Sequence, residues 1–170
     1  MSKYKNINLI PYTNNGKSLF LLIDNNGNRD IYFDFFIKKL SQQGDTKSTI
    51  QLYSYAVATF LDYLTEYTNV LINNNEFIDG YRLSEIIMDF PKFISSGIHT
   101  SDPLLKTIAS NLKTKPVSPA TEESYVAGVN RYLLISEEFR RRLFEMKDNN
   151  DSYEIVAENK LFPWLGEKRE

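Results

Sequence analysis

The sequence predicts a mainly α-helical domain that begins with a short β-hairpin. Three observations carry this prediction: an Asn-Gly pair between two apolar runs, and two long segments, one in each half of the chain, with apolar residues at spacings of three and four. At 170 residues, with 42% hydrophobic and 14% aromatic residues, the chain can bury a core within one domain.

The N-terminal hairpin is expected within residues 6–24. Apolar runs at residues 7–12 and 19–24 flank a turn that ends in Asn-Gly, and this pair is typical of a hairpin loop. Residues 24–28 resemble the start of a calcium loop, but the Glu at the twelfth position is missing. A simple turn is therefore expected after the second strand.

A first helix is expected from Ile31 to about Gln42. Asp30 is suited to cap its N-terminus, and Gly44 is suited to end it. The apolar residues of this segment fall on one broad face, so the helix should pack against the rest of the domain.

A second helix is expected from Ser48 to about Glu66, because Ser48 and Gln51 have the spacing of a capping box. A loop is then expected over residues 69–80. The apolar residues of the helix form one stripe: Ile50, Tyr53, Val57, Phe60, Leu64 and Tyr67.

Two shorter helices should follow. The first covers about residues 83–95 and should be interrupted before Pro91. The second covers residues 103–112, with Asp102 as its N-cap and a proline at its first position. Residues 113–116 then form a basic connector.

The last helix is expected from Ser118 to about Met146, with Pro119 at its first position. Its expected stripe contains Tyr125, Val129, Tyr132, Ser136, Phe139 and Leu143. A polar break should follow at residues 148–152. Residues 153–164 are then either a short helix or an extended arm.

Composition argues against several classes of site. The absence of cysteine excludes disulfides and thiolate zinc sites and favours a reducing cytoplasm. The single histidine, His99, has no nucleophile motif near it, and no phosphate-loop or dinucleotide glycine pattern is present. No apolar run reaches the ~18–20 residues that a membrane span requires. We therefore expect no catalytic residue, metal, cofactor, small-molecule substrate or membrane contact.

Nucleic-acid binding has some support from pattern. A net charge of −2 counts against a strongly basic binder, but not against a locally basic face. Lys47 lies just before a helix N-terminus, where Ser48, Thr49 and free N–H groups suit a phosphate. Small polar and basic residues share a stripe on the last helix: Thr121, Ser124, Gly128 and Arg131. The alternative is a solvated face with Gly128 as a helix-packing contact, which pattern alone favours.

Two segments together resemble a known family. Residues 35–64 read F-F-I-K-K-L-S-Q-Q-G-D-T-K-S-T-I-Q-L-Y-S-Y-A-V-A-T-F-L-D-Y-L, with Ser48-Thr49-Ile50, Tyr53 and Phe60-Leu61 at family spacing. The last helix opens with Ser-Pro-Ala-Thr at residues 118–121 and continues with Arg131-Tyr132 and Phe139. In order and spacing these segments resemble the N-terminal core-binding domain of tyrosine recombinases, the phage integrase family, over about residues 30–146.

The resemblance implies a four-helix, SAM-like orthogonal bundle that clamps a recombination half-site together with a catalytic domain. The implied partners are double-stranded DNA and other recombinase protomers on that DNA. The implied DNA contacts come from the openings of the two long helices and from the connector between residues 113 and 116. They are Lys47, Ser48, Thr49, Gln51, Lys113, Lys115, Thr121, Ser124 and Arg131.

The chain departs from the family where the chemistry would lie. A tyrosine recombinase needs a His-x-x-Arg box, and His99 is followed by Thr-Ser-Asp. We therefore expect a non-catalytic region with three parts: a hairpin arm at residues 1–29, a core-binding domain at residues 30–147, and an extension or linker at residues 148–170. The alternatives are a stand-alone helical protein-interaction module or accessory factor, and a small enzyme of unrecognised type.

Overall fold

A computed structural model describes residues 3–149 of the chain. The two strands are β1 (Ile7–Asn14) and β2 (Lys17–Asp24), and a short 3-10 turn (Gly97–His99) joins the fourth and fifth helices. The helices are α1 (Ile31–Gln42), α2 (Lys47–Asn73), α3 (Gly80–Met88), α4 (Phe90–Ser96), α5 (Pro103–Leu112) and α6 (Pro119–Asn149). The expected mainly helical fold with an N-terminal antiparallel hairpin is confirmed.

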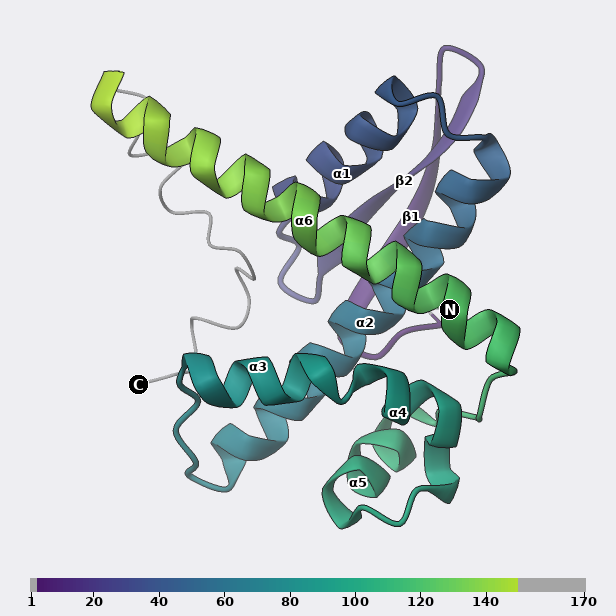
Figure 1. The fold of residues 1–170 in the computed structure, drawn as a ribbon, viewed down its shortest axis with the longest axis vertical. Helices are drawn as coiled ribbons and strands as arrows, with labels where there is room; N and C mark the ends of the chain where they lie inside the picture. Colours follow the sequence, from purple (N-terminus) through teal and green to yellow (C-terminus); the bar gives the residue numbers. More distant parts are fainter. Residues whose placement is uncertain (1–2, 150–170) are drawn as a thin grey trace.

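The long helices α2 and α6 cross near the middle of the molecule (Figure 1). The hairpin and α1 lie on one side of this crossing, and α3, α4 and α5 gather around the far end of α2. Buried side chains from both strands and all of these helices form one hydrophobic cluster. The crossing of α2 and α6 is therefore the frame on which the other elements pack.

The hairpin matches its sequence signal. Asn14 pairs with Lys17, and the two loop residues Asn15 and Gly16 have φ values of 52° and 77°. Positive φ at both positions is the geometry that favours Asn-Gly in a two-residue loop. Ile7 and Leu22 are 1% and 0% exposed, so the hairpin contributes to the core.

Helix α1 has the expected bounds, and Asp30 is its N-cap. The Asp30 carboxylate accepts the N–H groups of Tyr32 at 2.9 Å and Phe33 at 3.3 Å, and its second oxygen accepts the Tyr132 hydroxyl of α6 at 3.3 Å. Burial is the main cause that raises the pKa of Asp30 to about 7. One side chain thus caps α1 and ties it to α6.

Helix α2 differs from the sequence prediction at both ends. Its cap is Thr46 and not Ser48: the Thr46 hydroxyl accepts the Thr49 N–H at 3.2 Å. The helix also continues through Asn73, so the first part of the expected loop is helical. Tyr67 and Leu71 are buried there, and their packing outweighs the weak helix propensity of the neighbouring asparagines.

The shorter helices follow their proline and cap signals. The chain breaks between α3 and α4 at Asp89, and Pro91 lies in the first turn of α4. Helix α5 has the expected bounds, with the Asp102 carboxylate accepting two backbone N–H groups. Gly97 has a φ of 52°, and an added Cβ would lie 2.8 Å from the Thr114 carbonyl, so this glycine lets the connector pack closely.

Helix α6 begins at Pro119, as expected, and the Ser118 hydroxyl caps it by accepting the Thr121 N–H at 3.2 Å. Val129, Tyr132, Ser136 and Leu143 are buried along its stripe. The helix runs to Asn149, past the expected end at Met146. The expected arm at residues 153–164 and most of the expected 148–170 extension lie outside the described residues.

Candidate nucleic-acid interface

The first turn of α2 presents three of the predicted contact residues to solvent. Lys47, Ser48 and Gln51 are exposed, whereas Thr49 is half-buried. The Thr49 N–H and hydroxyl are both engaged with Thr46, at 3.2 and 3.0 Å. The positive end of the α2 dipole and the Lys47 ammonium therefore both present positive charge to solvent.

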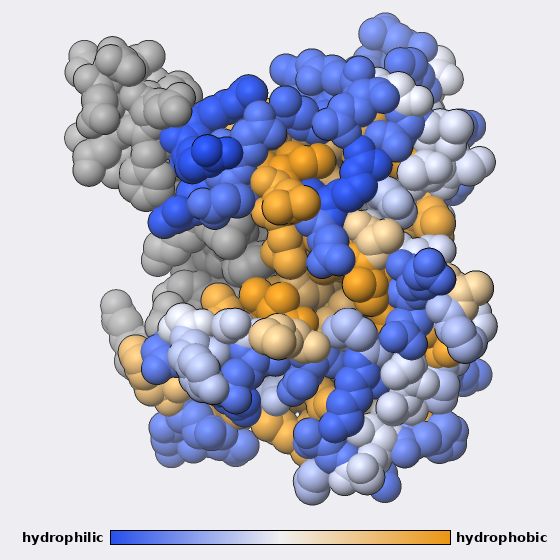
Figure 2. Space-filling model, viewed as in Figure 1, coloured by the Kyte–Doolittle hydropathy of each residue, from blue (hydrophilic) through white to orange (hydrophobic). Residues whose placement is uncertain are grey.

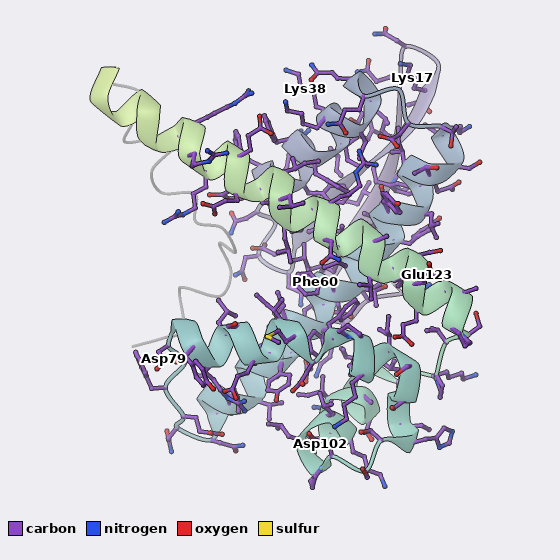
Figure 3. All side chains as sticks on the ribbon, viewed as in Figure 1. Lys17, Lys38, Phe60, Asp79, Asp102 and Glu123 are labelled. Atoms are coloured by element: carbon purple, nitrogen blue, oxygen red, sulfur yellow. The ribbon has the colours of Figure 1, made fainter. Side chains whose placement is uncertain are left out.

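The first turn of α6 is less open to an anion. Thr121 and Ser124 are half-buried, and the Thr121 N–H and hydroxyl are used by Ser118 at 3.2 and 3.1 Å. Glu122 is half-buried and Glu123 is exposed, and Figure 3 shows Glu123 on this part of α6. These carboxylates suit the helix dipole but repel a nearby phosphate.

Gly128 is a packing contact between α2 and α6. It is buried, and an added Cβ would lie 2.8 Å from the Tyr53 ring and 3.2 Å from the Ala56 methyl. A side chain at this position would separate the helices. Gly128 therefore does not form an open face for a DNA backbone, and the alternative interpretation of this glycine is confirmed.

Arg131 is held within the protein. Its guanidinium donates to both carboxylate oxygens of Asp45 at 3.0 Å and to the Gln43 amide oxygen, and it lies 5.7 Å from the centre of the Tyr53 ring. The hydrogen bond to Asp45 is the main cause that raises the pKa of Arg131. Arg131 thus joins α6 to the loop before α2, a role that sequence spacing did not indicate because its partners are distant in the chain.

The two connector lysines are exposed and lie close to the N-terminus. Lys113 and Lys115 line a surface hollow together with Lys3. Sequence reasoning missed Lys3, because nothing local indicates that the start of the chain meets the connector. The exposed members of the predicted set therefore form two groups, at the first turn of α2 and at the connector, separated by the α2–α6 crossing.

Two buried carboxylates of α2 were also missed. Asp62 and Glu66 are 5% and 4% exposed and hold the N-terminal segment by hydrogen bonds from Lys5 and Asn6. The sequence did contain a signal, since these two acidic residues, four positions apart, are the charged residues of the helix after Lys47. Buried carboxylates of this kind require polar partners.

His99 is exposed at the end of the 3-10 turn. Among residues 3–149, no three His, Asp or Glu side chains gather closely enough to hold a metal ion. Within the same residues, no helix combines the length and apolar character needed to cross a membrane.

No family model, no curated protein and no solved structure matches the chain. The functional argument therefore depends on the residues and their arrangement.

Proposed function

We propose that this chain is the N-terminal, DNA-binding region of a tyrosine recombinase, with a SAM-like bundle that clamps one face of a recombination half-site. One observation carries the proposal: the exposed first turn of α2 and the basic connector lie along the same side of the molecule, on either side of the first turns of α6 (Figure 1). Five of the nine residues that the family resemblance implies are exposed on this side: Lys47, Ser48, Gln51, Lys113 and Lys115.

The mechanism would be positional. Lys47 at one end and Lys113 and Lys115 at the other neutralise backbone phosphates, while exposed Gln51 has the amide that can bond a base edge. Thr59 of α2 lines the surface hollow beside the connector lysines. Lys47 and Thr59 are separated by about 18 Å along α2, at 1.5 Å per residue. That separation exceeds the ~12 Å width of a major groove, so the two groups would contact phosphates on either side of it.

Lys47 provides the sharpest test. Lys47→Glu should weaken binding to duplexes of any sequence by about tenfold at low salt and make the log K against log salt slope shallower by about 1. Fluorescence anisotropy across a salt series measures both quantities. Lys106→Glu, on the exposed face of α5, is the matched control and should bind with the parent affinity. Unchanged affinity for Lys47→Glu would remove the first turn of α2 from the interface.

A protein-interaction module is the second candidate, because the surface carries large exposed apolar side chains. Met88 at the end of α3 is 75% exposed and Leu134 on α6 is 74% exposed. Figure 2 shows apolar surface extending between these two helices. This candidate predicts no duplex binding at low salt, together with concentration-dependent self-association or partner binding that Leu134→Asp abolishes in sedimentation velocity.

A further inference from the structure

A surface hollow lies between the N-terminal segment, the middle of α2 and the connector from α5 to α6. Three exposed lysines line it: Lys3, Lys113 and Lys115. Four half-buried side chains with hydroxyl groups also line it: Tyr4, Thr59, Thr114 and Tyr125. Ammonium groups gathered around one concavity are donors that suit a phosphate.

The hollow has little negative charge to oppose an anion. Among the described residues that line it, Asp62 is the one acidic side chain. Its oxygens accept the backbone N–H groups of Lys5 at 3.2 Å and Asn6 at 2.8 Å, and it is 5% exposed. Three cations therefore face solvent, against one carboxylate directed into the protein.

Glu66 joins the two chain segments that carry the lysines of the hollow. Its carboxylate accepts hydrogen bonds from the Lys5 ammonium at 3.0 Å and from the side-chain amides of Asn6 at 3.2 Å and Asn111 at 2.9 Å. Lys5 is two residues after Lys3, and Asn111 is two residues before Lys113. One buried carboxylate thus joins the two segments that carry the lysines. The Lys3 ammonium also lies 5.8 Å from the ring centres of Tyr4 and Tyr55.

Lys113 adopts a backbone conformation that does not favour lysine. It follows α5 with a φ of 57° and a ψ of 43°, the left-handed geometry usually supplied by glycine after a helix. A side chain in this region is less favourable than glycine, because its Cβ crowds the backbone. A lysine that breaks the local rule in this way is expected where its charge is used.

We propose that this hollow binds one phosphate group of a DNA backbone, with Lys3, Lys113 and Lys115 as its cationic donors. Glu66 is a positioning residue, because it fixes the two segments without facing the anion. The choice of DNA as the carrier of the phosphate rests on the proposed function, whereas the phosphate chemistry rests on the hollow itself.

Duplex binding across a salt series tests the site. Lys3→Gln and Lys113→Gly should each lower affinity about three- to tenfold at low salt, and each should reduce the steepness of the salt slope by up to about 0.9, the value for one phosphate. In the double variant, the salt slope should become less steep by no more than about 0.9, the value for one phosphate. If the losses of salt slope in the two single variants add fully in the double variant, the proposal of one shared phosphate is overturned, because independent surface charges contribute additively.

Lys113→Gly also separates binding from folding. Glycine suits the left-handed position, so this variant should unfold at the same urea concentration as the parent or a higher one while binding DNA less tightly. Lys106→Gln, outside the hollow, should change neither quantity. If Lys3→Gln and Lys113→Gly bind like the parent while Lys47→Glu binds weakly, the hollow is overturned and the proposed function stands.

Inorganic phosphate provides the independent test. In amide NMR spectra of the full chain, phosphate should shift Lys3 and residues 113–115 selectively, and Lys3→Gln should remove those shifts. Selective shifts in a parent protein that fails to bind any duplex would uphold the hollow and overturn DNA as its ligand. The absence of selective shifts at millimolar phosphate, together with parent-like DNA binding by Lys3→Gln, would overturn the hollow.

Discussion

The two long helices open with similar sequences but present their first turns differently. Thr46 and Ser118 cap them in the same way, each accepting the N–H three residues later. Lys47 and Ser48 then face solvent on α2, whereas Thr121 in the first turn of α6 is half-buried. Further along α6, Gly128 packs against Tyr53 and Arg131 pairs with Asp45. A capped polar opening therefore predicts where a helix starts, but the helix packed against it decides which polar residues remain available to a ligand.

The close approach of the two helices gives the largest expected effect. Gly128→Leu should destabilise the fold by about 2 kcal/mol or more, because its side chain would overlap the Tyr53 ring. Urea unfolding followed by circular dichroism measures the loss. Ala127→Leu is the matched control, since Ala127 is exposed beside it, and it should unfold like the parent. Equal stability of the two variants would contradict the packing role of Gly128.

The comparison extends along α6 to Tyr132, whose hydroxyl reaches Asp30. Burial raises the pKa of Asp30 to about 7 from an ordinary value of 3.8, so between these values the folded protein keeps a proton that the unfolded chain releases. The stability from Asp30 is fully present below pH 3.8 and is lost as the pH rises through about 7.

Asp30→Asn isolates this contribution because asparagine also caps a helix but does not titrate. Between pH 5 and pH 7 the parent should lose about 2 kcal/mol of stability relative to the variant, at ~1.4 kcal/mol per pH unit. Urea midpoints at several pH values measure the difference. Parallel pH profiles for the two proteins would contradict a buried, protonated Asp30.

Arg131 should have a smaller effect on stability. Arg131→Met removes the paired hydrogen bonds to Asp45 at a partly exposed site, so we expect a loss of about 1 kcal/mol. The DNA readout distinguishes two roles. If Arg131 positions α2 and α6, Asp45→Asn should lower duplex affinity as much as Arg131→Met does. A larger effect from Arg131→Met, with a shallower salt slope, would instead indicate direct phosphate contact.

Glu123 should give the smallest effect. It is exposed in the first turn of α6, between the two basic groups of the proposed interface. Removing its charge in Glu123→Gln should raise duplex affinity about two- to fivefold at low salt and have little effect at high salt, since exposed charges are screened. Glu85→Gln on α3 is a suitable control. Unchanged affinity at low salt would mean that the first turn of α6 faces away from DNA.

The elements that local sequence specifies were predicted well. Asn15-Gly16 defined the hairpin loop, Asp30 and Asp102 defined the starts of α1 and α5, and Pro91 marked the interruption between α3 and α4. Each of these signals acts within a few residues, through a cap, a positive φ or a missing N–H.

The errors and omissions depend on distant packing. The N-cap of α2 is Thr46, two residues before the expected Ser48, and α2 continues past Glu66 because Leu71 is buried against other elements. Arg131 forms a hydrogen bond with Asp45, 86 residues away in the chain, and Asn6 forms one with Asp62, 56 residues away. Spacing rules do not predict such pairs. The sequence therefore indicated the types of residue at the proposed interface, but not which of them would be used in contacts within the protein.

The late position of α6 in the chain has a consequence for synthesis. Tyr132 packs edge-on against Phe36, and Phe139 packs against Tyr32 and Phe35, so the apolar face of α1 is completed by a helix made roughly a hundred residues later. At a synthesis rate of about 5–20 residues per second, the apolar face of α1 would stay exposed for several seconds before α6 is made. A nascent chain halted before Pro119 should therefore bind a chaperone that a chain extended through α6 releases.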